Sequence, residues 1–219
     1  MTTKKFNLRM LFIASFAIFA ASCSSDNSTP ADPFTPPTGE GTELNGSLNE
    51  DMTLDPSKEY SLTGTFSVSA GATLTIPAGT KIVAKVESGA SSSTYIVVQK
   101  GGKINVQGTS GSPVVMTSSN ESPGDWGGLV IAGDATTTEG TNATAEIGQI
   151  TYGGSNDTDD SGSINYLIIN YAGAQINAES QFNGLSLYGV GSGTTISNVA
   201  ILNGTDDGVE FFGGTVSAT

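Results

Sequence analysis

The chain has 219 residues and a formal net charge of −13, with 21 acidic residues, 8 lysines and arginines, no histidine and a single cysteine. A protein this acidic is a poor partner for DNA, RNA and anionic lipid surfaces. The lack of histidine excludes Ser-His-Asp and Cys-His catalysis, and it excludes zinc, iron or copper held by histidine. Carboxylate chemistry remains: acid–base catalysis by Asp and Glu, and calcium binding through oxygen atoms.

The N-terminus has the pattern of a signal peptide. Three cations, Lys4, Lys5 and Arg9, precede about ten apolar residues that end at Ala21. This apolar stretch is too short for a membrane-spanning helix, which needs about 20 residues. We therefore expect residues 1–22 to direct export and to be removed.

The apolar stretch ends in Ala20-Ala21-Ser22-Cys23, which resembles the lipobox of bacterial lipoproteins. The resemblance implies that Cys23 is lipidated and becomes the first residue of the mature chain. The alternative is an ordinary secreted protein, but its lone cysteine would have no disulfide partner. Ser24, rather than aspartate, follows the cysteine, which is compatible with the outer membrane. We expect a lipid anchor in that membrane and exposure at the cell surface.

Two regions of different composition follow the signal peptide. Residues 23–43 are rich in Pro, Ser and Thr, and they cannot bury enough apolar surface to fold, so we expect a disordered tether after the lipid. Residues 44–219 are rich in Gly, Thr, Ser, Asn, Val and Ile, and they lack a helical period. Short alternating runs such as Leu74–Ile76 and Lys103–Val106 predict strands between glycine turns.

Repeats indicate how these strands are arranged. Three pairs of segments resemble each other: Leu74–Ala84 with Ile96–Val106, Asn183–Gly189 with Asp207–Gly213, and Asn165–Asn170 with Asn198–Asn203. The first two pairs are offset by 22 and 24 residues, a period of short strands that predicts a β-solenoid in which each coil covers the next. The third pair is offset by 33 residues, which fits one coil with a loop inserted. The first repeat predicts that Ile76 stacks on Val98 and Ile82 on Ile104. The repeated asparagines predict either side-chain ladders along the axis or plain turns.

Several segments resemble a family of bacterial lipoproteins found especially in Bacteroidota. They are GATLTIPAGTKI, GDWGGLVIAGDA and, most specific, DDGVEFFGGTV at residues 206–216. The resemblance implies an all-β, right-handed parallel β-helix with a pectin-lyase-like fold. Because no activity is established for that family, the resemblance implies a fold rather than a function.

Family members usually continue for several coils beyond FFGGTV. We therefore expect the fold to be C-terminally incomplete at Thr219, with Val209, Phe211 and Phe212 poorly covered in the last coil. A solenoid end without a cap exposes unpaired backbone groups and an apolar cross-section.

The sequence contains one candidate metal site. Asp157, Asp159 and Ser161 have the alternating spacing of a calcium loop, and Gly162 allows the sharp turn after them. The position of the last EF-hand ligand is Ile168, so the loop is not an EF-hand. A plain acidic surface loop is the alternative.

Two further patterns are candidates for carbohydrate chemistry. Asp206, Asp207 and Glu210 resemble the paired carboxylates of polygalacturonase-type glycosidases, although Asp206 and Asp207 also fit a simple turn after a strand. Trp126, which is flanked by glycines, is a candidate for stacking on a sugar, or else it fills the solenoid core. The tyrosines at 152, 166, 171 and 188 add aromatic surface under the same alternatives.

Two functional classes follow from these features. The first is a membrane-anchored surface protein whose β-helix has a structural, adhesive or glycan-binding role, with the membrane and polysaccharide as partners. The second is a polygalacturonase-like enzyme. Such enzymes carry histidine and arginine or lysine around the substrate carboxylate, and this chain has no such cation near Asp206, so the first class is favoured.

The lipobox resemblance makes a direct prediction. Radiolabelled palmitate should enter the wild-type protein, and Cys23→Ser should abolish both the label and membrane fractionation, because this cysteine is the only thiol available for acylation. A Cys23→Ser protein that still fractionates with membranes would contradict the lipid anchor.

Overall fold

The structure is a computed structural model that describes residues 42–86, 93–178 and 180–219. The expected signal peptide, Cys23 and the tether before residue 42 lie outside the described residues. Within the described ranges, no helix has the length and hydropathy needed to cross a membrane.

The described chain is built from β-strands, as the sequence predicts. The strands are β1 (Glu43–Leu48), β2 (Met52–Thr53), β3 (Glu59–Val68), β4 (Thr73–Pro77), β5 (Lys81–Ala84), β6 (Tyr95–Val98), β7 (Lys103–Gln107), β8 (Val114–Ser118), β9 (Leu129–Ala132), β10 (Ala143–Thr144), β11 (Thr151–Tyr152), β12 (Gly162–Asn170), β13 (Leu185–Val190), β14 (Thr195–Leu202), β15 (Val209–Gly214) and β16 (Ser217–Ala218). All but β10 and β11 belong to one sheet, and the pairings within that sheet are parallel.

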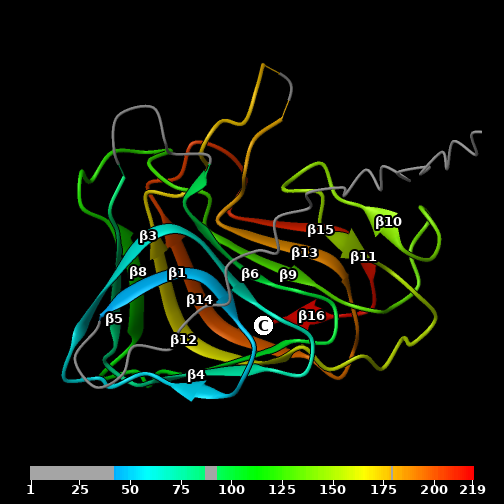
Figure 1. The fold of residues 1–219 in the computed structure, drawn as a ribbon, viewed down its shortest axis with the longest axis horizontal. Helices are drawn as coiled ribbons and strands as arrows, with labels where there is room; N and C mark the ends of the chain where they lie inside the picture. The colour runs from blue at the N-terminus through cyan, green and yellow to red at the C-terminus, as the bar shows by residue number, and fades with distance from the viewer. Residues whose placement is uncertain (1–41, 87–92, 179) are drawn as a thin grey trace, which may run out of the picture.

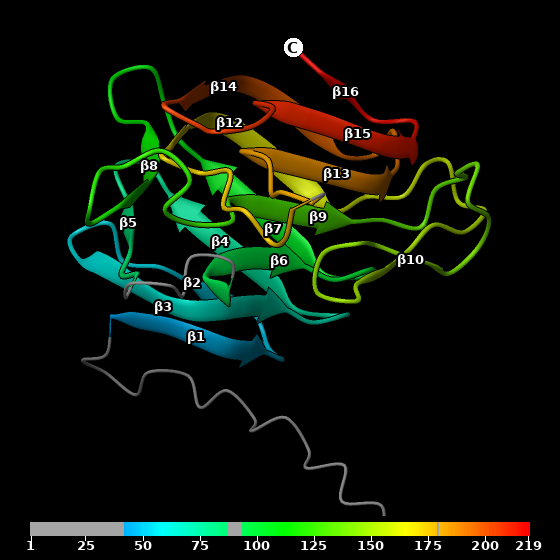
Figure 2. The ribbon, with the colours of Figure 1, turned by 90° about the horizontal axis from the view of Figure 1, so that it is seen from above.

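The parallel sheet winds into a β-helix with three faces. Face A contains β5, β8, the start of β3 and the ends of β12 and β14. Face B contains the end of β3 followed by β6, β9, β13 and β15, which Figure 2 shows stacked in that order. Face C contains β2, β4, β7, β16 and the starts of β12 and β14. This arrangement confirms the predicted parallel β-helix.

Columns of apolar side chains fill the space between the three faces. On face B, one column follows the strand register from Val68 through Val98, Ile131 and Leu187 to Phe211. The first four of these are fully buried, whereas Phe211 in the last coil is 48 % exposed. Each buried methylene contributes about 0.8 kcal/mol, so continuous columns stabilise the stack of coils.

The observed register confirms one predicted repeat and corrects another. Leu185 pairs with Val209, as the similarity of their two segments predicts. The register predicted by the first repeat is wrong for Ile76, which pairs with Val106 rather than Val98. It is also wrong for Ile82, which pairs with Tyr60 and Met116 rather than Ile104.

The reason for the wrong register lies in the length of this coil. The segment Leu74–Ala84 passes from face C to face A, whereas Ile96–Val106 passes from face B to face C. The two segments resemble each other because both are a strand, a glycine turn and a strand at neighbouring corners of the helix. The segment between β5 and β6 lengthens this coil, and β4 pairs with β7 instead of β6.

The third repeat is shifted by one residue from its predicted register. Asn165 pairs with Ser197 rather than with Asn198. Both predicted roles of the asparagines are present. The Asn198 side-chain amide donates to Asn165 Oδ1 at 2.8 Å along the axis, and Asn198 and Asn203 adopt φ values of 54° and 55° at bends.

Two coils approach each other closely at the start of β12. Gly162 has a φ of 110°, and a Cβ there would lie 2.1 Å from the Ile104 carbonyl oxygen. We expect Gly162→Ala to lower the free energy of unfolding by at least about 3 kcal/mol, because it combines backbone strain with overpacking.

The matched control is Gly111→Ala, where a Cβ meets no atom within 4 Å. That substitution should change the stability by less than about 1 kcal/mol in the same thermal or denaturant unfolding measurement. Equal effects of the two substitutions would contradict the register between β7 and β12.

Candidate functional site

The outer surface of face B is covered by a second apolar cluster outside the helix. Its outward-facing members include Val97 on β6, Val130 on β9 and Tyr188 on β13. The covering residues come from the long segment between β9 and β12, called the insertion here (residues 133–161), and from residues 174–176 and Phe182. Ile147 of the insertion and Phe182 are almost fully buried in this cluster.

The insertion is fastened to the coils by polar contacts. Lys100 Nζ donates to Asn142 Oδ1 at 2.7 Å and to the Gly153 carbonyl at 3.1 Å, and it lies 3.2 Å from the Asp134 carboxylate. Lys103 forms a second link to Asp160 at 2.6 Å. The insertion therefore has a fixed place beside face B, and it contains the short antiparallel pair β10–β11.

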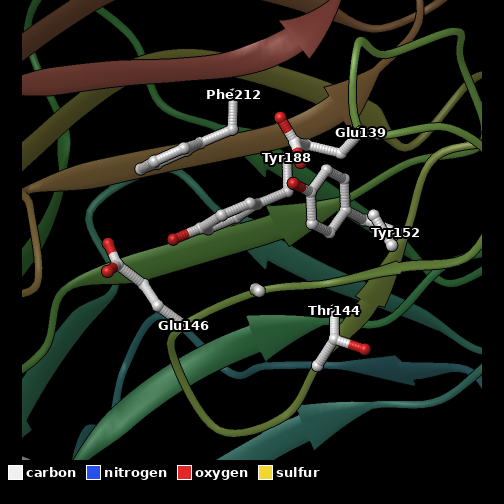
Figure 3. Close-up of a pocket in the computed structure, with 8 residues that line it drawn as sticks. Glu139, Thr144, Glu146, Tyr152, Tyr188 and Phe212 are labelled. Atoms are coloured by element: carbon white, nitrogen blue, oxygen red, sulfur yellow. The ribbon is translucent and has the colours of Figure 1, made fainter.

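A pocket of about 550 Å³ lies between the insertion and the last two strands of face B (Figure 3). Both parts of the structure contribute to its lining, which consists of Glu139, Ala143, Thr144, Ala145, Glu146, Tyr152, Tyr188 and Phe212. Among these described lining residues the only charged side chains are the two glutamates.

One wall of the pocket is aromatic because of the strand register. Tyr188 on β13 and Phe212 on β15 are direct partners in the parallel ladder, so their side chains leave the sheet on the same side. Their rings stack with centroids 4.0 Å apart and an interplanar angle of 5°. Tyr152 from β11 meets Tyr188 at 5.0 Å and 58°. Figure 3 shows the three rings grouped on one side of the pocket.

Acidic side chains lie beside the buried hydroxyls of Tyr188 and Tyr152, and both burial and charge affect the pKa of these tyrosines. Burial raises the pKa of Tyr188 far above its usual value, with Glu146 and Glu210 adding to the effect. Burial also raises the pKa of Tyr152, again with help from nearby glutamates. A tyrosine is already neutral at physiological pH, and the raised pKa values extend this neutral form to more alkaline pH.

A comparison with known protein families shows which family this β-helix matches. The chain matches the pectate-lyase-like β-helix domain over residues 46–219. It belongs to that family. Searches of the curated proteins and of the solved structures found no significant match.

Membership of the pectate-lyase-like β-helix domain family supports the fold and does not by itself locate a site. None of the carboxylates predicted from the sequence is among the residues that line the pocket. Asp206 and Asp207 are exposed on the segment between β14 and β15. Glu210 projects from face B and accepts a hydrogen bond from the buried Asn183 amide at 2.7 Å.

Trp126 occupies the core position that was the alternative to sugar stacking. It is 1 % exposed, and its indole N–H donates to the Asn170 carbonyl at 2.8 Å. Tyr152 and Tyr188 are the two predicted tyrosines that line the pocket. Tyr166 and Tyr171 instead adopt positive φ values at bends.

The candidate calcium residues are engaged in hydrogen bonds within the protein. Asp157 Oδ1 accepts from the Thr136 amide at 3.0 Å, which lowers the Asp157 pKa. Ser161 Oγ donates to Asp159 Oδ2 at 3.2 Å. Within the described ranges, no group of three or more Asp, Glu, His or Cys residues could hold a metal ion.

Sequence reasoning missed Glu139, Glu146 and Phe212 as members of one site. No local motif connects them, because the insertion brings residues 139–152 next to strands that lie much later in the chain. The only signal available was the length of the polar stretch between two predicted strands.

The calcium hypothesis stays a prediction and is tested by melting. A site at Asp157, Asp159 and Ser161 predicts a higher melting temperature in millimolar calcium, since a ligand that binds only the folded state stabilises it. The double variant Asp157→Ala, Asp159→Ala should lose that increase. Unchanged melting of the wild-type protein with calcium would remove the site from consideration.

Proposed function

We propose that the protein is a lipid-anchored component of the outer membrane whose β-helix is displayed at the cell surface and binds carbohydrate. The observation that carries the carbohydrate-binding part is the pocket beside face B, where an aromatic wall and two glutamates face the same space. The lipid anchor rests on the sequence alone, through the lipobox around Cys23.

The composition of the pocket supports a sugar as its ligand. Sugars bind through apolar C–H surfaces against aromatic rings and through hydroxyl groups that donate to carboxylates. Phe212 supplies a half-buried ring, and the exposed Glu139 and Glu146 supply acceptors. A volume of about 550 Å³ is within the range of small-ligand pockets.

A carbohydrate-active enzyme is the second candidate, and the same two glutamates favour it. Glycoside hydrolysis requires two carboxylates, one of which acts as an acid. If the pocket is catalytic, reducing ends should accumulate from a bound oligosaccharide, and Glu139→Gln and Glu146→Gln should each stop their release. Binding without turnover supports the binding protein.

A glycan array tests the proposed function. We expect the full chain, purified in detergent micelles, to bind one group of oligosaccharides, and Phe212→Ala to weaken that binding at least about tenfold through loss of the aromatic contact. Phe211→Ala is the matched control, because Phe211 lies on the same strand and does not line the pocket.

Two outcomes would contradict the proposal. An array without any glycan bound, from a protein that melts cooperatively, would remove carbohydrate binding. Equal losses from Phe212→Ala and Phe211→Ala would show that the pocket is not where the glycan binds.

A further inference from the structure

The pocket contains a buried hydroxyl group without a partner. Tyr188 is 1 % exposed, and its Oη has no hydrogen-bond partner among the described residues. Leaving such a group unpaired costs about 1–3 kcal/mol, and the large majority of buried polar side-chain atoms are paired. Tyr60, a comparably buried tyrosine, follows that rule, since its hydroxyl accepts from the Asp55 amide at 2.8 Å.

The groups around Tyr188 Oη determine which part of a ligand could form a hydrogen bond with it. Figure 3 shows the hydroxyl directed toward the side of the pocket where the Glu146 carboxylate lies. The tyrosine hydroxyl can donate one hydrogen bond and can also accept, whereas a carboxylate can only accept. A group placed between them must donate to Glu146, and a sugar hydroxyl can do so while it accepts from Tyr188.

The charge of the pocket restricts the ligand further. Glu139 and Glu146 line it and Glu210 lies close enough to influence Tyr188, so a uronate carboxylate would be repelled. The two lysines that fasten the insertion are already paired, Lys100 with Asp134 and Lys103 with Asp160. No lysine is among the described residues that line the pocket.

We propose that the pocket selects an uncharged saccharide over a uronate and binds one of its hydroxyls between Tyr188 Oη and the Glu146 carboxylate. This inference rests on the proposed carbohydrate-binding function and specifies the class of sugar. Glu146 is exposed, so its side chain can shift to admit a ligand hydroxyl beside Tyr188 Oη, and in the unliganded protein it accepts a hydrogen bond from Ser180 Oγ at 3.1 Å.

A ligand role for Tyr188 has a signature that a purely structural role lacks. Tyr188→Phe removes an unpaired buried hydroxyl, so the free protein should keep its melting temperature or gain stability. The same substitution should raise the dissociation constant for the glycan about 5- to 10-fold, the effect of one lost hydrogen bond. Tyr60→Phe should do the reverse, with a lower melting temperature and unchanged binding.

The experiment measures dissociation constants of the full chain in detergent micelles. The probes are three sets of oligosaccharides: uncharged gluco-, manno- and xylo-oligosaccharides, chitosan oligomers with free amines, and oligogalacturonates. Wild type, Tyr188→Phe, Glu146→Gln and Tyr60→Phe are compared, with Glu50→Gln as an exposed glutamate outside the pocket. We expect an uncharged set to bind at least about tenfold more tightly than the galacturonates.

The outcomes separate this inference from the proposed function. If no set binds, the carbohydrate-binding function itself fails. If a set binds but galacturonates or chitosan oligomers bind as tightly as the uncharged sugars, the selectivity is wrong while the function stands. If Tyr188→Phe or Glu146→Gln leaves the dissociation constant unchanged, the hydroxyl is not held between these two groups.

Discussion

The structure depends on the parallel pairing of β13 with β9 on one side and β15 on the other. In a parallel ladder, residues that are direct partners project to the same side of the sheet, so one register sets two columns of side chains. Ile131, Leu187 and Phe211 form the inner column of the core, while Ala132, Tyr188 and Phe212 form the outer column. The aromatic wall of the pocket is thus a direct consequence of how the coils stack. A register shift of one residue would turn the inner column outward and the outer column into the core.

The insertion forms the other side of the pocket, and the coils of the β-helix do not require it. The cost of closing a loop grows only slowly with its length, so a coil can carry an insertion with little loss of stability. The insertion recovers that loss by burying Ile147 and Ile150 against the outer side of face B. Lys100 then fixes its polar side through three contacts. A regular scaffold and an added segment together make a concave surface that neither makes alone.

The sequence predicted the fold class correctly because strand alternation and repeats are local properties. The repeat that joins Leu185 to Val209 was correct since β13 and β15 are joined by a short, regular coil. The repeat that placed Ile76 on Val98 failed because similar turns recur at successive corners, and sequence similarity cannot distinguish a neighbouring corner from a stacked one. Coil length, which sets the true register, is controlled by segments outside the strands.

The candidate site was harder to predict for the same reason. Tyr152 and Tyr188 were recognised as possible aromatic surface, but Glu139 and Glu146 on the insertion are distant in sequence from Tyr188 and Phe212. Trp126 has the glycine-rich surroundings of a sugar-stacking residue, and yet those glycines allow close packing in the core, where the indole N–H finds the Asn170 carbonyl. Contacts made by an insertion against a later strand leave no periodic signal in the sequence.

The unpaired hydroxyl of Tyr188 shows how this scaffold can tolerate a costly feature. A penalty of about 1–3 kcal/mol for one buried polar group would matter in a small domain. Here the ring carrying that hydroxyl is held by Phe212 on one strand and Tyr152 on the insertion, and the ladder beneath it is buried in several successive coils. The scaffold keeps the ring in place without help from the hydroxyl. The oxygen is therefore free to bond to a ligand, and like any tyrosine hydroxyl it is a donor at physiological pH.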